Sequence, residues 1–580
     1  MTKREEVVST IKELINKSLN NIVKNNYEIV IEIPPNPEMG DLAIPLFSYS
    51  NILKKKPFEI GELLKNDIEK APIIYETAIK GAYLNIFLNR NSIFESIITD
   101  ILSNGDNFAK QPPNNIKVVL EFSSPNTNKP LHLGHCRNNV LGDFISKIYR
   151  FCGYSLTSIN LINDRGIHIC KSMLAYKLFG NGVTPESEGK KSDHLVGDFY
   201  VKYAAEEKNN HDLENEAKKM LTLWENNDNE TIDLWKKMND WAISGMKETY
   251  KKMGIEFDNF EYESNNYLLG KDIVMDGLNR DIFFKESDNS VWVDNSDVGL
   301  DKKALLRADG TSIYITQDLG TAKKRYDIYN ATKFIYVVGS EQNYHFDTLF
   351  ATLKKLGFEW AENCFHLSYG MVNLQDGKMK SREGKVIDAD NLIDLLYNLA
   401  KKEIDERNKD IDEDEKKYIA EKVALSALKF YLLNFSTSKD IMFIPEKSIS
   451  FDGNTGPYIQ YTTSRINSLI TKNGDNISNG ITIYKYDSSN YKFNQDEWNV
   501  IYHLLNFEDT VIKSCENLSS VELTTYIYEL SKRFNKFYHD NPILSEVENT
   551  KNIRLNISLA TFQILKIGLR LLGIEPLNKM

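Results

Sequence analysis

Residues 121 to 135 read Glu-Phe-Ser-Ser-Pro-Asn-Thr-Asn-Lys-Pro-Leu-His-Leu-Gly-His, and this stretch decides the fold. It follows an apolar run, residues 116 to 120, which is typical of a buried parallel strand. It precedes apolar residues at helical spacing from Val140 to Ile148, a pattern that stops near Gly153. The sequence therefore predicts a strand that leads into the N-terminus of a helix, with His-Leu-Gly-His at the junction.

A strand-to-helix junction of this kind is a natural phosphate site. Unpaired backbone N–H groups and the helix dipole both favour anions there, and Gly134 allows a ligand to approach the backbone closely. His132 and His135 can donate hydrogen bonds to oxygens that gain charge during phosphoryl chemistry. The tetrapeptide alone would occur by chance, and the alternative is a polar loop with a structural pair of histidines.

The residues around the tetrapeptide narrow the interpretation. The segment resembles the "HIGH" signature of class I aminoacyl-tRNA synthetases, and its Ser-Ser-Pro-Asn and Lys-Pro resemble the arginyl-tRNA synthetase family. Residues 377 to 384, Gly-Lys-Met-Lys-Ser-Arg-Glu-Gly, resemble the second class I signature, Lys-Met-Ser-Lys-Ser. When the two are aligned residue by residue, Ser381 stands where the signature has its second lysine. Many arginyl enzymes share this loss and carry a lysine just before HIGH, where this chain has Lys129.

The resemblance implies a multidomain α/β fold of three parts, as the length of 580 residues also suggests. These are a small α+β N-terminal domain, a class I Rossmann-type catalytic domain with a helical insertion, and an all-α C-terminal anticodon-binding domain. We expect them at residues 1–110, 111–410 and 411–580, with the insertion at about 181–290. Within them we expect an amphipathic helix from Val7 to Leu19 and strands at residues 81–88, 155–162, 291–294, 312–318 and 334–338.

Composition and charge restrict the class of protein. No run of 18 apolar residues and no N-terminal apolar segment are present, so we expect a cytoplasmic protein that neither spans a membrane nor is secreted. The 5 cysteines form no CxxC pair, so we expect no zinc. The net charge of -11 argues against a nonspecific nucleic-acid binder, but an acidic body can still bind tRNA through local basic patches.

The resemblance implies a set of ATP-binding and catalytic residues. His132, His135 and Lys129 would stabilise charge on the phosphates, and Lys380 and Arg382 would contribute secondarily. The ATP-binding residues would be Pro125, Leu133, Gly134, Lys378, Met379 and Ser381. The alternative for residues 378 to 385 is a solvated basic turn. Asn163 and Arg165 depart from the family's usual Gly-Asp-Trp-Gly, so residues 163–166 predict a shared turn more than a shared ligand contact.

A guanidinium substrate needs planar acceptors in a fork. The resemblance implies an arginine pocket made of Glu121, Asn126, His135, Tyr314, Asp318 and Gln342. Glu121 ends a strand, and we expect Asp318 to open a helix that follows another strand. Both would therefore lie at the carboxyl edge of the sheet. The residue assigned here as Gln342 could instead be a direct neighbour, Glu341 or Asn343. The alternative for Tyr314 is an aromatic residue of the core.

Two further groups of residues would bind tRNA by resemblance. Tyr83 and Asn85 are candidates to contact a D-loop base, the alternative being a plain core strand. The anticodon candidates are Tyr458, Tyr461, Arg465, Tyr538 and Met580. Their alternative is aromatic packing between helices. Asn541-Pro542-Ile543 stands where the family often has a tryptophan, which leaves the stacking geometry there open.

These features predict an enzyme that ligates L-arginine to its tRNA with ATP and Mg²⁺, without an obligate protein partner. Members of the family generally need tRNA even for amino-acid activation. A rival is another class I synthetase, such as the cysteinyl type, which would want a zinc-binding cysteine set. A second rival is an inactive tRNA-binding relative, which we would expect to lack His132, His135 or Asp318; this chain has all three.

Overall fold

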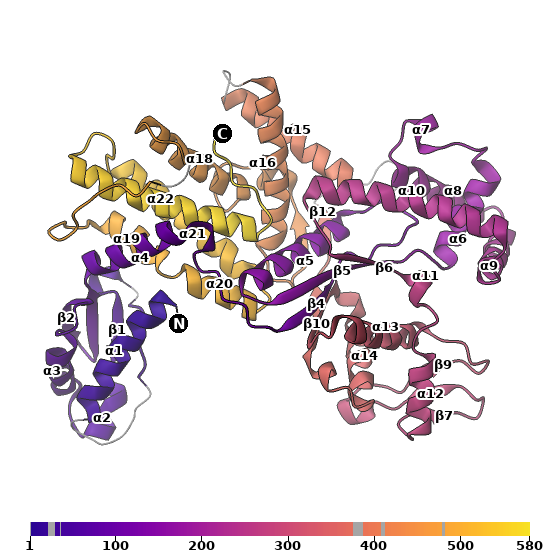
Figure 1. Cartoon of the computed structure of the whole chain (residues 1–580), viewed down its shortest axis with the longest axis horizontal. Helices are drawn as coiled ribbons and strands as arrows, with labels where there is room; N and C mark the ends of the chain where they lie inside the picture. Colours follow the sequence, from indigo (N-terminus) through magenta and orange to yellow (C-terminus); the bar gives the residue numbers. More distant parts are fainter. Residues whose placement is uncertain (1, 21–28, 35, 375–386, 408–411, 478–481) are drawn as a thin grey trace.

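The computed structural model describes residues 2–20, 29–34, 36–374, 387–407, 412–477 and 482–580. Its centre is a sheet of parallel strands in the order β11-β10-β4-β5-β6 (Figure 1). The strands are β4 (Lys117–Glu121), β5 (Ser155–Ile162), β6 (Asn259–Tyr262), β10 (Lys333–Gly339) and β11 (Cys364–Tyr369). The chain builds outward from β4 to β6, then returns to β10 beside β4. Strand order therefore reverses between β4 and β10, and folds of this kind bind ligands outside the carboxyl ends at such a point.

Helix α5 (Leu133–Phe151) follows β4 and connects it to β5, as the sequence predicts. Its residues Val140, Leu141, Phe144, Ile145 and Ile148 are all buried. Gly142 faces Phe122, and a side chain there would overlap the phenyl ring. The close contact fixes the middle of α5 against the residue that follows β4.

Helices separate β5 from β6 and have a core of their own, which includes Met173, Tyr203 and Ala242. They are α6 (Ile167–Phe179), α7 (Pro185–Glu188), α8 (Ser192–Glu207), α9 (Asp212–Glu225) and α10 (Asn229–Met253). Our expected insertion, 181–290, needs correction, because β6 lies within it and pairs with β5 in the main sheet. The purely helical part begins earlier, at α6, and ends before β6.

Between β6 and β10 the chain forms a small antiparallel sheet and more helices. The elements are α11 (Glu263–Asn266), α12 (Lys271–Asn279), β7 (Phe284–Lys285), β8 (Val291–Val293), η3 (Ser296–Val298), β9 (Lys303–Leu306) and α13 (Tyr314–Tyr329). The strand expected at 291–294 is β8, but it pairs with β7 and β9, outside the main sheet. The strand expected at 312–318 is wrong, because α13 begins at Tyr314 and Ser312 makes only an isolated bridge to Leu306.

The N-terminal part is a three-stranded antiparallel sheet, β1-β3-β2, with helices packed on it. Its elements are α1 (Lys3–Asn20), η1 (Pro37–Met39), β1 (Leu42–Pro45), α2 (Phe47–Leu53), α3 (Pro57–Ile68), β2 (Ile74–Lys80) and β3 (Tyr83–Leu88). The apolar face of α1 that the sequence predicts is confirmed, since Val7, Ile11, Ile15 and Leu19 are buried.

Helix α4 (Arg90–Asn104) and η2 (Gly105–Asn107) leave this sheet and pack on the C-terminal helices. Phe94 lies 4.9 Å from Phe493, measured between ring centroids, and Arg90 Nη1 donates to the Phe493 carbonyl at 3.1 Å. Trp498 Nε1 also donates to Asp41 at 2.7 Å. The first and last parts of the chain therefore share one apolar core.

The remaining elements are mostly helical. They are η4 (Ser340–Gln342), α14 (Asn343–Lys355), η5 (Glu359–Asn363), β12 (Val372–Leu374), α15 (Ala389–Arg407), α16 (Glu413–Leu433), β13 (Ile441–Phe443), α17 (Pro445–Ser448), α18 (Gly456–Lys472), α19 (Gln495–Leu504), α20 (Phe507–Glu516), α21 (Val521–Asp540) and α22 (Glu548–Leu571). One short strand, β13, interrupts the helices expected after residue 411 and pairs with β12. Among the described residues, no helix is both long and apolar enough to cross a bilayer.

Candidate active site

The two histidines of residues 132–135 cap helix α5. His132 is the N-cap, and its Nδ1 accepts a hydrogen bond from Gly134 N at 3.1 Å. His135 Nδ1 accepts from His132 N at 3.2 Å, which completes a reciprocal capping box. Since both Nδ1 atoms are acceptors, a neutral ring must carry its proton on Nε2. Within the part of the chain that the structure describes, each histidine is thus left with one N–H donor, Nε2–H, that has no hydrogen-bond partner.

The protonation of this pair follows from its burial. Burial, with the nearby Lys129 ammonium, lowers the pKa of His132 to about 4. Burial, with His132 and Lys129, lowers the pKa of His135 well below its usual value. Burial also lowers the pKa of Lys129. Near pH 7 the junction therefore offers two neutral Nε2–H donors beside a lysine, at a helix N-terminus, which suits a polyphosphate.

The turn between β4 and α5 is strained and tightly held. Ser123 and Ser124 both have positive φ, 72° and 44°, a conformation that is costly for residues other than glycine. Ser123 N donates to Asn138 Oδ1 at 2.5 Å, and Asn163 Nδ2 donates to the Ser124 carbonyl at 2.9 Å. Asn163 N also donates to the carbonyl of the buried Pro125 at 3.0 Å. Asn163, which departs from the family's usual glycine, thus holds this turn.

The other departure, Arg165, has a structural role as well. Its guanidinium lies 4.0 Å from the ring centroid of Tyr267 and 5.2 Å from that of Trp224. It also pairs with Glu225 at 2.9 Å. These contacts fasten α9 to the end of β5.

Glu121 and Asp318 line the same small cavity, of about 50 Å³, at the carboxyl edge of the sheet. Thr321, Ala322, Arg325 and Tyr336 line it too. Glu121 pairs with the buried guanidinium of Arg325, and its other oxygen accepts from Ser124 Oγ at 3.0 Å. Arg325 also pairs with Glu261 at 3.0 Å. The cavity is too small for an arginine side chain and already contains a guanidinium of the chain itself.

The sequence analysis missed two residues here, Arg325 and His345. His345 Nε2 lies 2.6 Å from Asp318 Oδ2. Arg325 could have been found, because Asp318, Thr321, Ala322 and Arg325 follow the i, i+3, i+4, i+7 spacing of one helix face. No local pattern identifies His345, which lies 27 residues from Asp318.

Other predicted residues are not brought to this cavity. Tyr314 is 76% exposed at the start of α13, so it is not the core aromatic of the alternative interpretation. Gln342 and Asn126 are exposed too, at the ends of β10 and β4. Of the ATP-binding candidates, Leu133 is buried and Gly134 is half-buried in the first turn of α5. Lys378, Met379, Lys380, Ser381 and Arg382 lie outside the described residues.

The candidates for anticodon binding gather between α18 and α21. The Arg465 guanidinium lies 4.7 Å from the ring centroid of Tyr461 and 5.4 Å from that of Tyr538. Asn535, which the sequence analysis missed, binds Arg465 and donates to Tyr458 Oη at 3.0 Å. Met580 ends a tail whose backbone carbonyls accept hydrogen bonds from Gln460, Ser464 and Asn467 of α18.

Tyr83 and Asn85 lie on β3, in the N-terminal sheet. Tyr83 is half-buried and packs edge-on against Phe47, with ring centroids 5.9 Å apart. Asn85 is 2% exposed, and its buried Nδ2 has no hydrogen-bond partner among the described residues. An unpaired buried amide is costly, so Asn85 does not behave as a plain core residue.

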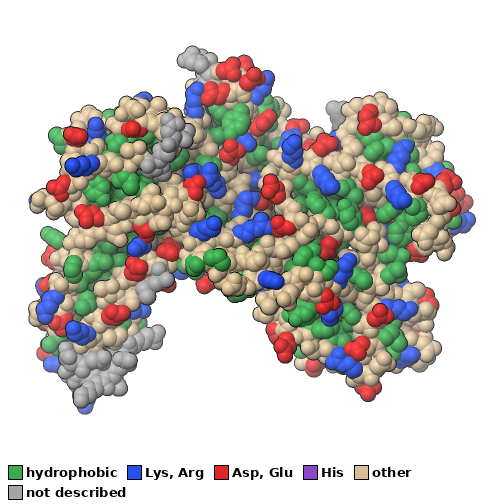
Figure 2. Space-filling view, viewed as in Figure 1, with side chains coloured by type: hydrophobic (Ala, Val, Ile, Leu, Met, Phe, Trp, Pro, Cys, Tyr) green, Lys and Arg blue, Asp and Glu red, His purple; other side chains and the backbone are tan. Residues whose placement is uncertain are grey.

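A cleft of about 600 Å³ lies between α5, α22 and the C-terminal tail. Lys147, Lys566 and Arg570 line it. Figure 2 shows Lys and Arg side chains gathered near the middle of this face, about where α5, α16 and α22 meet in Figure 1. Asp106 pairs with both Lys566 and Arg570 at 2.7 Å, and Asp143 pairs with Lys147. Glu575 also lines the cleft, so the positive charge of its lining is largely neutralised.

Comparison with known families matches three consecutive parts of the chain. The models are "Arginyl tRNA synthetase N terminal domain" at residues 9–88, "tRNA synthetases class I (R), catalytic domain" at 97–443 and "DALR anticodon binding domain" at 459–580. An arginine–tRNA ligase of Treponema denticola is 47% identical, over 99% of this chain and 100% of its own. One of Borrelia turicatae is 43% identical, over 99% of this chain and 98% of its own.

Solved structures agree on the fold. The arginyl-tRNA synthetase of Thermus thermophilus superposes with a TM-score of 0.82 over 99% of this chain and 100% of its own, at 24% identity. The one from Plasmodium falciparum gives 0.77 over 99% of each chain, at 21% identity. The predicted fold class is confirmed: an N-terminal domain, a parallel-sheet catalytic domain and a helical C-terminal domain. The chain therefore belongs to the class I arginyl-tRNA synthetase family.

Proposed function

We propose that this chain is an arginine–tRNA ligase. It activates L-arginine with ATP to arginyl-adenylate and pyrophosphate, then transfers the arginyl group to the 3′-terminal adenosine of its tRNA and releases AMP. The observation that carries this proposal is that the chain after β4 supplies both a capped histidine pair and Glu121, which shares a cavity with Asp318. Phosphate donors and guanidinium acceptors thus lie along one edge of one sheet.

In the nucleotide half, the substrate carboxylate attacks the α-phosphate of ATP, which is bound together with Mg²⁺. The free Nε2–H groups of His132 and His135 donate to phosphate oxygens as negative charge develops there. Pro125, Leu133 and Gly134 form the adjoining wall. Lys129 supplies the cation that Ser381 cannot, with Lys380 and Arg382 as secondary contributors.

In the amino-acid half, Glu121 and Asp318 accept the substrate guanidinium, and Asn126, His135, Tyr314 and Gln342 complete the pocket. The cavity between the carboxylates must widen to admit it. Three carboxylates, Glu121, Glu261 and Asp318, face one internal cation, Arg325. The surplus negative charge favours a second guanidinium. Lysine, with a single ammonium, would leave fork-shaped acceptors unpaired.

Three surfaces bind the tRNA in this proposal. Tyr83 and Asn85 contact a splayed base at the elbow, and the unpaired Asn85 amide supports that role. Tyr458, Tyr461, Arg465, Tyr538 and Met580 contact the anticodon, where the Arg465 stack offers planar faces. The Lys and Arg side chains near the middle of the face in Figure 2 contact phosphates between them. The protein acts in the cytoplasm, where its substrates are.

ATP–pyrophosphate exchange with a panel of amino acids, with and without tRNA, tests the proposal. We expect exchange with arginine and with no other amino acid of the panel. We also expect this exchange to depend on tRNA, as in other members of the family. Exchange with cysteine instead of arginine would favour the rival class I enzyme. Tight tRNA binding without any exchange would favour an inactive tRNA-binding relative.

A further inference from the structure

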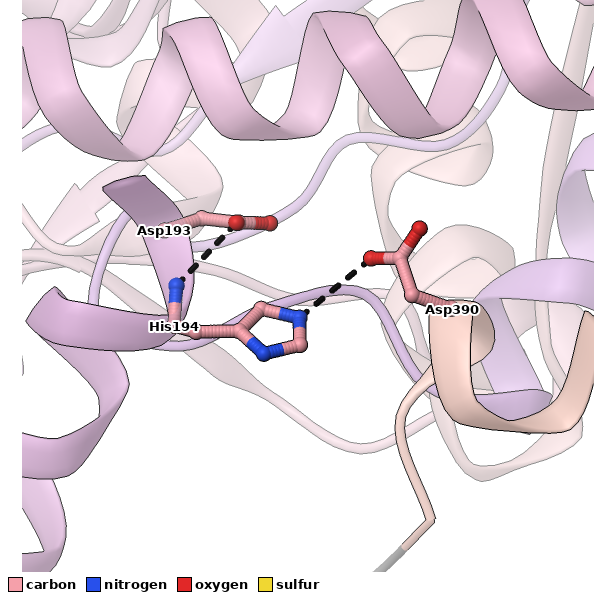
Figure 3. A group of neighbouring side chains, drawn as sticks. All are labelled: Asp193, His194 and Asp390. Atoms are coloured by element: carbon pink, nitrogen blue, oxygen red, sulfur yellow. Dashed lines mark hydrogen bonds and ion pairs between the residues drawn. The ribbon is translucent and has the colours of Figure 1, made fainter. Parts of the chain in front are cut away.

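A cluster of charged side chains lies next to the histidine pair and takes no part in the proposed chemistry. It joins Lys191, Asp193 and His194 of the α8 region to Thr249 of α10 and Asp390 of α15. Figure 3 draws three of these side chains, Asp193, His194 and Asp390. Asp390 Oδ2 accepts from Lys191 Nζ at 2.7 Å, His194 Nε2 at 3.3 Å and Thr249 Oγ1 at 3.2 Å. One carboxylate thus connects the inserted helices to the start of α15.

The cluster is built around the ammonium of Lys191. Lys191 Nζ also donates to Asp193 Oδ2 at 3.1 Å and to Thr249 Oγ1 at 2.5 Å. The side chain of Asp193 is completely buried, and Gly245 of α10 packs directly on it. Two aspartates and a histidine could suggest a metal site, but Lys191 already bridges both carboxylates. The buried charge is therefore balanced within the chain.

Two contacts link this cluster to the residues before α5. Ala389 N donates to the Leu131 carbonyl at 2.8 Å, and Asp388 pairs with His132 as an antiparallel bridge. Helix α8 also touches the same segment directly. A β-carbon at Gly197 would lie 2.7 Å from Pro130 Cδ and 3.6 Å from Lys129 Cα.

We propose that Lys191 and His194 are positioning residues for amino-acid activation. By holding Asp390 they fix residues 388–389 against 131–132, and so set the direction of Lys129, His132 and His135 toward ATP. In the described ranges, neither side chain makes a hydrogen bond to Lys129, His132 or His135, so their effect passes through the backbone. This inference rests on the proposed function, because it assigns these residues to its first step.

The inference also predicts a pH dependence. The His194 ring faces Asp390 and Asp388 of α15, the latter at 4.0 Å, and Asp193 and Lys191 of its own region. Thr249 faces the cluster from α10, and the buried Cys136 thiol faces it from α5. The hydrogen bond to Asp390 raises the pKa of His194 despite its burial. The imidazolium therefore strengthens the cluster below about pH 6.5, and this contribution is lost as pH rises through the raised pKa.

The test uses the full-length protein and measures ATP–pyrophosphate exchange at saturating arginine and tRNA, from pH 6 to 9. We expect Lys191→Met to lower kcat/KM for ATP by ~10–100-fold, the scale of a small misplacement of reacting groups. KM for arginine should stay unchanged. His194→Gln should remove the rise in the KM for ATP that the wild type shows as pH increases past the His194 pKa. His132, whose pKa is about 4, does not titrate in this window.

Lys190→Met is the matched control. Lys190 is adjacent in sequence, but its ammonium pairs with Asp198 at 2.8 Å on the surface. We expect this variant to behave as the wild type, and Lys191→Arg to recover part of the loss in Lys191→Met. Because Lys191 and Asp390 act as one unit, Lys191→Met with Asp390→Asn should cost little more than either change alone.

Unchanged ATP kinetics in Lys191→Met and His194→Gln would overturn the inference. An equal loss for ATP and arginine, together with a lower melting temperature, would do so too, since it would indicate a purely structural cluster. If Lys191→Met does not fold, His194→Gln and Lys191→Arg decide the outcome. Equilibrium binding of ATP to the same variants separates this test from the proposed function, because it needs neither arginine nor exchange.

Discussion

The nucleotide half and the amino-acid half of the candidate site differ in what holds their side chains. His132 and His135 are held by backbone N–H groups no more than three residues away. Glu121 and Asp318 are held by side chains of distant segments, Arg325 being 204 residues from Glu121. The side-chain conformations of the two histidines are therefore set by local hydrogen bonds, while the distant cluster around Asp390 only adjusts the direction of their segment. The amino-acid half exists only when several elements have packed together.

This difference has a consequence for ligand binding. The histidines keep their Nε2–H groups free, so phosphates meet donors that are already aimed. Glu121 and Asp318 have their acceptors engaged by Arg325, Ser124 and His345, so a guanidinium must share or displace these partners. We expect mutations in the nucleotide half to reduce the rate at constant stability. Mutations in the amino-acid half should change stability and arginine affinity together.

Removal of Arg325 should produce the largest effect. Arg325→Met leaves Glu121 and Glu261 without their buried cation, which should cost about 3–5 kcal/mol of unfolding free energy. Denaturant unfolding measures this loss. Arg280→Met, at an exposed pair with Asp276, is the control and should cost about 0–1 kcal/mol. A loss below that of the control would mean that the amino-acid half does not depend on this distant partner.

Lys129→Ala tests the nucleotide half. We expect ATP–pyrophosphate exchange to fall by ~10²–10³-fold, the usual scale for one charge contact in the transition state. Stability should hardly change, because Lys129 is half-buried and no carboxylate pairs with it among the described residues. Lys117→Ala, at the exposed opposite end of β4, is the control. An unchanged kcat in Lys129→Ala would show that Lys129 does not replace the lysine that is missing at position 381.

Asp318→Asn should have the smallest of the three effects. A charge-assisted hydrogen bond becomes a neutral one of about half the strength, so the KM for arginine should rise by ~10-fold. The KM for ATP should stay constant in steady-state exchange assays. Asp327→Asn changes the same group on the same helix, at an exposed pair with Lys323, and should alter neither constant. Equal changes in the KM for arginine and the KM for ATP would show that Asp318 does not belong to the arginine pocket.

The same contrast explains what the sequence could predict. The junction at 121–135 was predictable, because the strand, the N-cap and the helical spacing are local signals. Arg325 was missed although its helical spacing places it on the face of Asp318. His345 carries no such local signal, since only packing brings it to Asp318. The strand expected at 312–318 failed because the alternating Ile313 and Ile315 belong to the entry and first turn of α13. The short strand β6 was assigned to the insertion because its surroundings are polar and helical.

The packing of α4 on the C-terminal helices has a consequence for biosynthesis. Phe94, Ile97, Ile98 and Ile101 are buried against residues that lie roughly 400 positions later in the chain. At a typical ribosomal rate of about 5–20 residues per second, these apolar side chains wait about 20 to 80 s for their partners. During that interval the nascent N-terminal part exposes an uncovered apolar helix. Completion of this packing thus depends on segments translated much later, and until then α4 presents an apolar face of the kind that chaperones bind.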